Sequence, residues 1–335
     1  MKTIRVRPRW AVAPTALLLV AAAQAQGIVR IDGSSTVFPI TEAVAEEFQS
    51  ETRGAFKVVV GVSGTGGGFK KFYRGDIDIC DASRPIMASE MRECQKAGIE
   101  YIELPIAFDA LTVMVNPANT FVDRLTIAEL KKIWEPEAQG KVTHWSQVRD
   151  GWPHEPLKLY GAGSDSGTFD YFTEAAVGKA KASRGDYTAS EDDNTLVQGI
   201  AGDKNALGYF GYAYYAANRG KLRAVPIVNP KGEAVQPAPE TVMNGQYAPL
   251  SRPVFLYVNR KALDRPEVQK FVEFYLAHGA ALAREVKYIP LPADAYKKGQ
   301  ERLAARRLGT AFGGHPETGL HVDELFNRPL ATAPR

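Results

Sequence analysis

Long apolar runs are scarce in this chain of 335 residues. The apolar stretch at residues 16–23 is well short of the ~20 residues that span a bilayer, and no later segment is long and apolar enough. A small-x-small cleavage site, Ala23-Gln24-Ala25, follows this stretch. Four basic residues precede it: Lys2, Arg5, Arg7 and Arg9. The pattern predicts a cleaved export signal at residues 1–25 and a mature chain that begins at Gln26.

An excess of positive charge is also missing once the signal is set aside. The whole chain has 41 lysines and arginines against 38 acidic residues, a net charge of +3. Residues 1–25 hold four cations and no acid, so the net charge of the mature chain is −1. A nucleic-acid surface needs a basic field, and we therefore expect no nucleic-acid partner. The hydrophobic fraction of 45% is that of a globular protein with one large or two compact domains.

Cysteine is limited to two residues, Cys80 and Cys94. No cysteine follows the apolar core of the signal, which argues against a lipid anchor. In an oxidising compartment the two thiols can form one disulfide that closes a short loop and adds about 2–4 kcal/mol of stability. Two free buried thiols are the alternative, because the sequence does not give the separation of the two Cα atoms.

Catalytic and metal-binding signatures are absent as well. No serine lies in a Gly-x-Ser-x-Gly turn, and the five histidines show no metal-ligand spacing. The stretch from Gly61 resembles the start of a phosphate loop, but Gly67 and Gly68 stand where lysine and a hydroxyl are needed. We therefore expect no enzyme, no metal and no cofactor. An exported phosphatase with Ser166 or Ser35 as nucleophile is the less favoured alternative.

What the chain does have is a series of hydroxyl-rich junctions between strands and helices. The central one, residues 161–172, follows an alternating strand at 157–160 and leads into a helical pattern. Its glycines allow a tight turn, and its hydroxyls lie where a helix leaves its first N–H groups unpaired. Such a junction is either an ordinary helix cap or an anion site.

Three more junctions share this character. Residues 32–36 precede a helix at 38–48 that Ser35 or Thr36 can cap, residues 61–68 follow a strand at 56–60, and residues 81–86 follow a strand at 77–80. Charge-assisted hydrogen bonds from these loops, each worth about 1.5–3 kcal/mol, could hold a small tetrahedral oxyanion. The candidate ligand residues are Ser34, Ser35, Thr36, Ser63, Gly64, Thr65, Asp81, Ser83, Arg84, Ser164, Asp165, Ser166, Gly167 and Thr168.

Strands that alternate with helices predict an α/β fold with a largely parallel sheet. We expect separate strands at 101–106 and 110–116, a capping box from Thr126 to Glu129, and an irregular segment at 135–156. The similar strands 111–116 and 254–259 are the natural crossings between two lobes. Lobe one would comprise residues 27–112 and 256–335, lobe two residues 113–255, with the ligand in the cleft between them.

The four junctions together resemble a known family, the periplasmic phosphate-binding proteins of phosphate ABC transporters. The resemblance covers nearly all of the mature chain and implies a two-lobed, type II periplasmic binding protein. Such a protein closes on inorganic phosphate and delivers it to a membrane permease, and we expect a monomer. By position, Thr36 with the following amide, Ser63, and Ser166-Gly167-Thr168 match the family's phosphate contacts. A receptor for sulfate or molybdate is the alternative within binding proteins.

The sequence departs from the family pattern at two points. Many members carry an arginine where this chain has Ala162. Many also have Ala-Ser-Asp before their proline, whereas this chain has Ala82-Ser83-Arg84. The Ser-Arg-Pro branch of the family implies that Arg84 supplies the cationic contact. The carboxylate that discriminates phosphate from sulfate is then Asp81 or Asp165. We favour Asp81, because Arg84 lies three residues further on and can hold it ionised.

Overall fold

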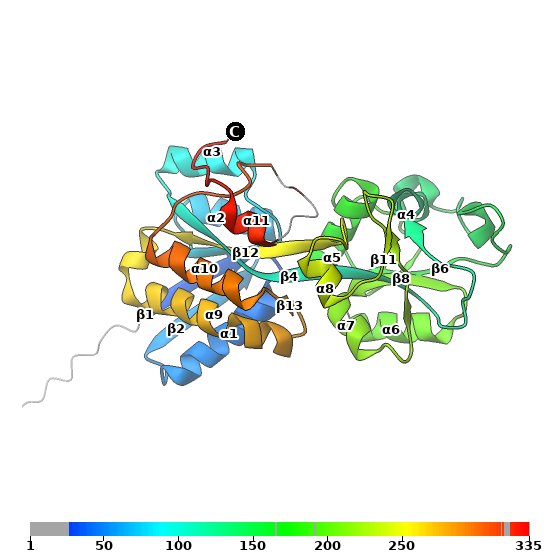
Figure 1. Cartoon of the computed structure of the whole chain (residues 1–335), viewed down its shortest axis with the longest axis horizontal. Coiled ribbons are helices and arrows are strands. Elements are labelled where there is room, and N and C mark those ends of the chain that lie inside the picture. Colours follow the sequence, from blue (N-terminus) through cyan, green and yellow to red (C-terminus); the bar gives the residue numbers. More distant parts are fainter. Residues whose placement is uncertain (1–26, 165, 191, 316, 318–321, 335) are drawn as a thin grey trace, which may run out of the picture.

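The computed structural model describes residues 27–164, 166–190, 192–315, 317 and 322–334, so the predicted signal lies outside the described residues. Two lobes lie side by side, and two long strands run from one to the other (Figure 1). Each lobe has helices packed on its part of a continuous sheet. The expectation of a two-lobed α/β fold is confirmed.

Lobe one is built from both ends of the chain (Figure 1). Its helices are α1 (Phe38–Glu51), α2 (Thr65–Tyr73), α3 (Ala88–Ala97), α9 (Pro266–Glu285), α10 (Ala293–Ala304) and α11 (Val322–Asn327). Its strands are β1 (Gly27–Gly33), β2 (Phe56–Val62), β3 (Ile79–Ala82), β12 (Ser251–Asn259) and β13 (Ile289–Pro290).

Lobe two is built from the middle of the chain (Figure 1). Its helices are α4 (Ile127–Trp134), α5 (Gly167–Phe172), α6 (Asp193–Gly202), α7 (Tyr212–Ala217) and α8 (Pro239–Met243). Its strands are β5 (Leu125–Thr126), β6 (Lys158–Ala162), β7 (Thr188–Ser190), β8 (Ala206–Gly211), β9 (Arg223–Ala224), β10 (Ile227–Val228) and β11 (Ala234–Val235). The strand β4 (Tyr101–Val115) belongs to both lobes.

The main sheet has the strand order β2-β1-β3-β12-β4-β8-β6-β7. Its outer parts are parallel, as expected, but β12 pairs antiparallel with both β3 and β4, and β4 pairs antiparallel with β8. The two strands expected at 101–106 and 110–116 are one strand, because Asp109 continues the ladder opposite Arg252. The central strands β4 and β12 therefore form the connection between the lobes.

Packing of amphipathic helices holds lobe one together. Phe48 of α1 lies 5.4 Å, centroid to centroid, from both Phe271 and Phe274 of α9. Phe69 of α2 lies 4.9 Å from Tyr257 of β12. In lobe two, the predicted capping box starts α4, because the Glu129 amide donates to the Thr126 hydroxyl over 3.1 Å. Within the described part of the chain, no helix combines the length and the apolarity that a membrane crossing requires.

Cys80 and Cys94 are free, buried thiols. The structure thus has the two buried thiols of the second alternative, and the prediction that they are also unbonded in solution follows. Burial raises the pKa of both groups, that of Cys94 to about 12, so little thiolate is present at neutral pH.

A thiol titration tests this directly. The native protein is expected to react only slowly with a thiol reagent, because both groups are shielded and protonated. In guanidinium chloride without reductant, both thiols should react. If neither thiol reacted in the denaturant, the two would be bonded to each other in solution.

Candidate functional site

Three loops of lobe one meet at the ends of β1, β2 and β3. The Ser34 amide donates to the Asp81 carbonyl over 3.0 Å, and the Ser63 amide donates to the Gly33 carbonyl over 3.1 Å. The Ser83 amide donates to the Thr65 hydroxyl over 3.1 Å. Because parallel strands end at one edge of their sheet, these loops come together there. Three of the four predicted motifs thus form one surface.

The loop after β1 differs from the prediction in how it starts α1. Ser34, rather than Ser35 or Thr36, accepts the hydrogen bonds at the start of this helix. Its hydroxyl accepts from the Thr36 amide over 3.2 Å, and its carbonyl accepts from the Val37 and Phe38 amides. The Thr36 hydroxyl is buried and has no hydrogen-bond partner among the described residues. The Thr36 carbonyl accepts from the Tyr288 hydroxyl over 2.5 Å. The Thr36 hydroxyl is therefore free to donate to a ligand.

The fourth motif comes from lobe two and touches the first. Ser166 caps α5, because its hydroxyl accepts from the Thr168 amide over 3.1 Å. A methyl group at Gly167 would lie 2.7 Å from the Ser35 hydroxyl oxygen and 3.0 Å from the Thr36 amide nitrogen. Ser164 is exposed beside this turn, whereas Asp165 lies outside the described residues. The two lobes therefore meet at their hydroxyl-bearing loops.

A carboxylate and a lysine orient Ser63. The Ser63 hydroxyl donates to Asp32, and the other Asp32 oxygen pairs with the Lys71 ammonium over 2.5 Å. A serine hydroxyl has one proton, so Ser63 keeps only lone pairs for further bonds. The next residue, Gly64, has a φ of 74° and turns the chain into α2.

Arg84 is already engaged by a carboxylate. Its two terminal nitrogens donate to the two Glu90 oxygens over 2.9 and 2.8 Å, in the bidentate geometry typical of strong pairs. The guanidinium also lies over the Phe69 ring, 5.6 Å from its centroid. To bind an anion as the sequence predicted, Arg84 would have to leave or share this ion pair.

Asp81 lies beneath the loop after β1. Its side chain is fully buried, and neither carboxylate oxygen has a partner of good geometry in the described part of the chain. A Cβ at Gly33 would collide with it. Burial raises the pKa of the Asp81 carboxyl to about 7, against the lowering effect of the nearby Thr41 hydroxyl. The structure therefore gives Asp81 a place in the core of lobe one.

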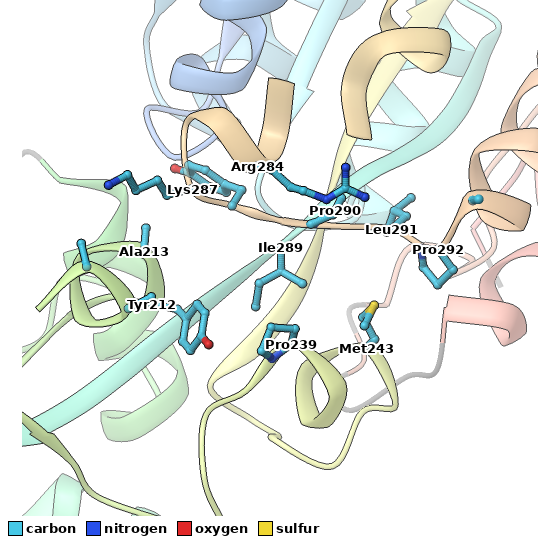
Figure 2. Close-up of a pocket in the computed structure, with 14 residues that line it drawn as sticks. Tyr212, Ala213, Pro239, Met243, Arg284, Lys287, Ile289, Pro290, Leu291 and Pro292 are labelled. Carbon is cyan, nitrogen blue, oxygen red and sulfur yellow. The ribbon is translucent and has the colours of Figure 1, made fainter. Parts of the chain in front are cut away.

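Two cavities lie between the lobes. One, of about 150 Å³, is lined by Thr168 and by Pro39, Asp109 and Tyr288. The other, of about 660 Å³, shares Tyr288 with it and is bounded mainly by apolar residues of α7, α8 and β13 (Figure 2). None of the four motifs lines the larger cavity. The smaller one adjoins the site, and among the described residues no cluster of three or more potential metal ligands occurs.

Sequence reasoning missed three residues beside the motifs: Asp109, Arg252 and Tyr288. Asp109 and Arg252 lie inside long strands, where no glycine or hydroxyl pattern marks them. Tyr288 lies just after α9, between Lys287 and β13. No local signal identifies these residues, since they reach the motifs only through strand register and the packing of distant segments.

Comparison with known proteins gives consistent relationships. The family model described as PBP superfamily domain matches residues 20–278. Protein SphX of Synechococcus elongatus is 51% identical, over 95% of this chain and 94% of that protein. Phosphate-binding protein PstS of Staphylococcus saprophyticus is 38% identical, over 83% of this chain and 85% of that protein.

A solved structure is similarly close. A crystal structure described as a possible phosphate binding protein from Planctomyces limnophilus is 52% identical, with a TM-score of 0.77, over 84% of this chain and 99% of that one. The match extends over both lobes. The chain therefore belongs to the PBP superfamily and, within it, to the family of the phosphate-binding protein PstS.

Proposed function

We propose that this protein captures inorganic phosphate between its lobes and delivers it to the permease of an ABC transporter. The observation that carries the proposal is the contact between Gly167 of lobe two and the Ser35–Thr36 turn of lobe one. It brings hydroxyl-rich loops of both lobes to one point. The relationship to PstS supports phosphate as the ligand.

The groups that would hold phosphate are mostly neutral donors. We assign this role to the Thr36 and Thr168 hydroxyls and to Ser35, Ser166 and the Gly167 amide. Their bonds to a dianion are charge-assisted, so several together can exceed the cost of removing the ion from water. The Ser63 hydroxyl already donates to Asp32, so it would line the site without donating to the ligand.

Capture and delivery need the lobes to separate and close. We assign residues 27–112 and 256–335 to one moving unit and 113–255 to the other, with β4 and β12 as the connection. Closure by a hinge between two lobes is a common response to ligands. We also propose that residues 1–25 direct export to the periplasm, where the mature protein acts as a monomer.

Calorimetry with phosphate, sulfate and molybdate, beside a chromogenic phosphate-ester assay, tests the proposal. We expect saturable binding with phosphate preferred and no ester turnover. Ser166→Ala should weaken phosphate binding by about tenfold, since it removes one charge-assisted bond and a helix cap. Preference for sulfate or molybdate would identify a different oxyanion receptor. Ester turnover that Ser166→Ala or Ser35→Ala abolishes would identify a phosphatase.

A further inference from the structure

Arg252 and Asp109 form a buried pair on the two strands that connect the lobes. Arg252 of β12 lies opposite Asp109 of β4 in the antiparallel register. Their side chains are only 12% and 8% exposed. Arg252 Nε lies 3.6 Å from Asp109 Oδ2, which is too long for a hydrogen bond. The two charges therefore attract each other without completing their hydrogen bonds.

Both side chains keep unused hydrogen-bonding groups. Nε and Nη2 of Arg252 and Oδ2 of Asp109 are buried and have no hydrogen-bond partner in the described part of the chain. The guanidinium instead stacks on the Tyr171 ring, 3.6 Å from its centroid. Unsatisfied buried charges are costly, so a site that keeps them calls for a partner able to meet both donor and acceptor.

The pair lies beside the hydroxyl-rich motif of lobe two. Asp109 lines the 150 Å³ cavity together with Thr168. Tyr171, on which Arg252 stacks, belongs to α5, the helix that begins with Gly167 and Thr168. Tyr288 lines the same cavity and holds the Thr36 carbonyl. Asp109 thus shares a cavity with Thr168, and Arg252 stacks on the helix that begins with Gly167 and Thr168.

From this geometry we infer that Arg252 and Asp109 complete the phosphate site: Arg252 as its cation and Asp109 as the acceptor of the phosphate proton. This inference rests on the proposed function. The Arg252 N–H groups would donate to phosphate oxygens, which is the role that Arg84, paired with Glu90, does not fill here. Sulfate carries no proton near neutral pH, so its lone pairs would face those of Asp109 and be repelled.

The other polar and charged groups around the pair either bond to other residues or lie elsewhere on the cavity wall. Tyr171 donates its hydroxyl to the Pro249 carbonyl over 2.7 Å, which holds the ring under the guanidinium. Asp170 on the same helix has Lys181 3.9 Å away. Lys287 and Asp193 also line the cavity. Among the described residues, Arg252 is the cation that pairs with Asp109.

Titration of the wild type with phosphate and sulfate, followed by the same titrations of variants, tests the inference. Arg252→Gln is expected to weaken the binding of both anions by at least about tenfold. Asp109→Asn should weaken phosphate, strengthen sulfate, and reduce the ratio of the two affinities by at least about tenfold. Asp81→Asn tests the rival carboxylate, which lies in the core of lobe one, and should leave the ratio of the two affinities unchanged.

The outcomes separate the inference from the proposed function. If the wild type binds no phosphate, the proposed function fails. If the wild type binds phosphate and Asp109→Asn keeps the wild-type ratio, the inference alone is overturned. The inference alone is also overturned if Asp81→Asn, rather than Asp109→Asn, reduces the ratio of the phosphate and sulfate affinities. Should Arg252→Gln not fold, as judged by its thermal unfolding, the nearly isosteric Asp109→Asn decides the question by itself.

Discussion

Gly167→Ala is expected to weaken phosphate binding by about 10- to 100-fold while the protein stays folded. The added methyl group would collide with the Thr36 hydroxyl oxygen and would lie 2.7 Å from the Ser35 hydroxyl oxygen, closer than real Cβ atoms come; the Thr36 amide nitrogen would be 3.0 Å away. These atoms belong to the other lobe, so the lobes can relieve the clash by staying apart. Overpacking typically costs 1–3 kcal/mol, which here would fall on the closed state alone.

Calorimetry with phosphate and a thermal melt without ligand measure the two effects separately. Gly202→Ala is the matched control, because a methyl group there meets no atom within 4 Å. The control should bind phosphate like the wild type. Unchanged affinity of Gly167→Ala would mean that the Ser35–Thr36 turn and α5 do not meet in the bound protein.

Asp81→Asn is expected to stabilise the protein at pH 8 by about 2 kcal/mol or more, and to have little effect at pH 4. Burial raises the native pKa of this carboxyl to about 7, whereas an unfolded aspartate has a pKa of about 3.9. Between these values the native state binds more protons than the unfolded state, so Asp81 lowers the unfolding free energy as the pH rises. Asparagine carries no charge and removes this loss, although its amide also needs partners.

Denaturant unfolding at pH 4, 6 and 8 measures the effect. Asp186→Asn provides a control of opposite sign. The bonds from Arg184 lower the pKa of Asp186 to about 2, so its stabilising contribution is present at neutral pH and is lost as the pH falls. A gain for Asp81→Asn that is larger at pH 4 than at pH 8 would contradict the assignment of a raised pKa.

Local sequence patterns predicted the elements and loops whose causes are local. The helix starts, the capping box at Thr126 and the four hydroxyl-rich junctions each depend on residues a few positions apart. The break expected near Asp109 was wrong for a physical reason. Aspartate is a weak strand former, but β4 is paired along its whole length and Arg252 lies opposite this residue. Tertiary context overrides the propensity.

The charged part of the candidate site was not predictable in the same way. Arg84 has a bidentate carboxylate partner six residues away on the next helix, and only the structure shows the two side chains aligned. Arg252 meets Asp109 through the register of two strands that are distant in sequence. Such pairs depend on the completed sheet, so no short motif reports them.

The place of β12 in the sheet has a consequence for the order of folding. β3 has β1 on one side and β12 on the other, and β12 is synthesised after all of lobe two. Lobe one also needs α9, whose Phe271 and Phe274 pack on Phe48. The amino-terminal part of lobe one therefore cannot complete its sheet and its core until β12 and α9 have been synthesised. An incomplete lobe one cannot bury its core, and a chain that has not yet folded is the form in which the export that we propose would take place.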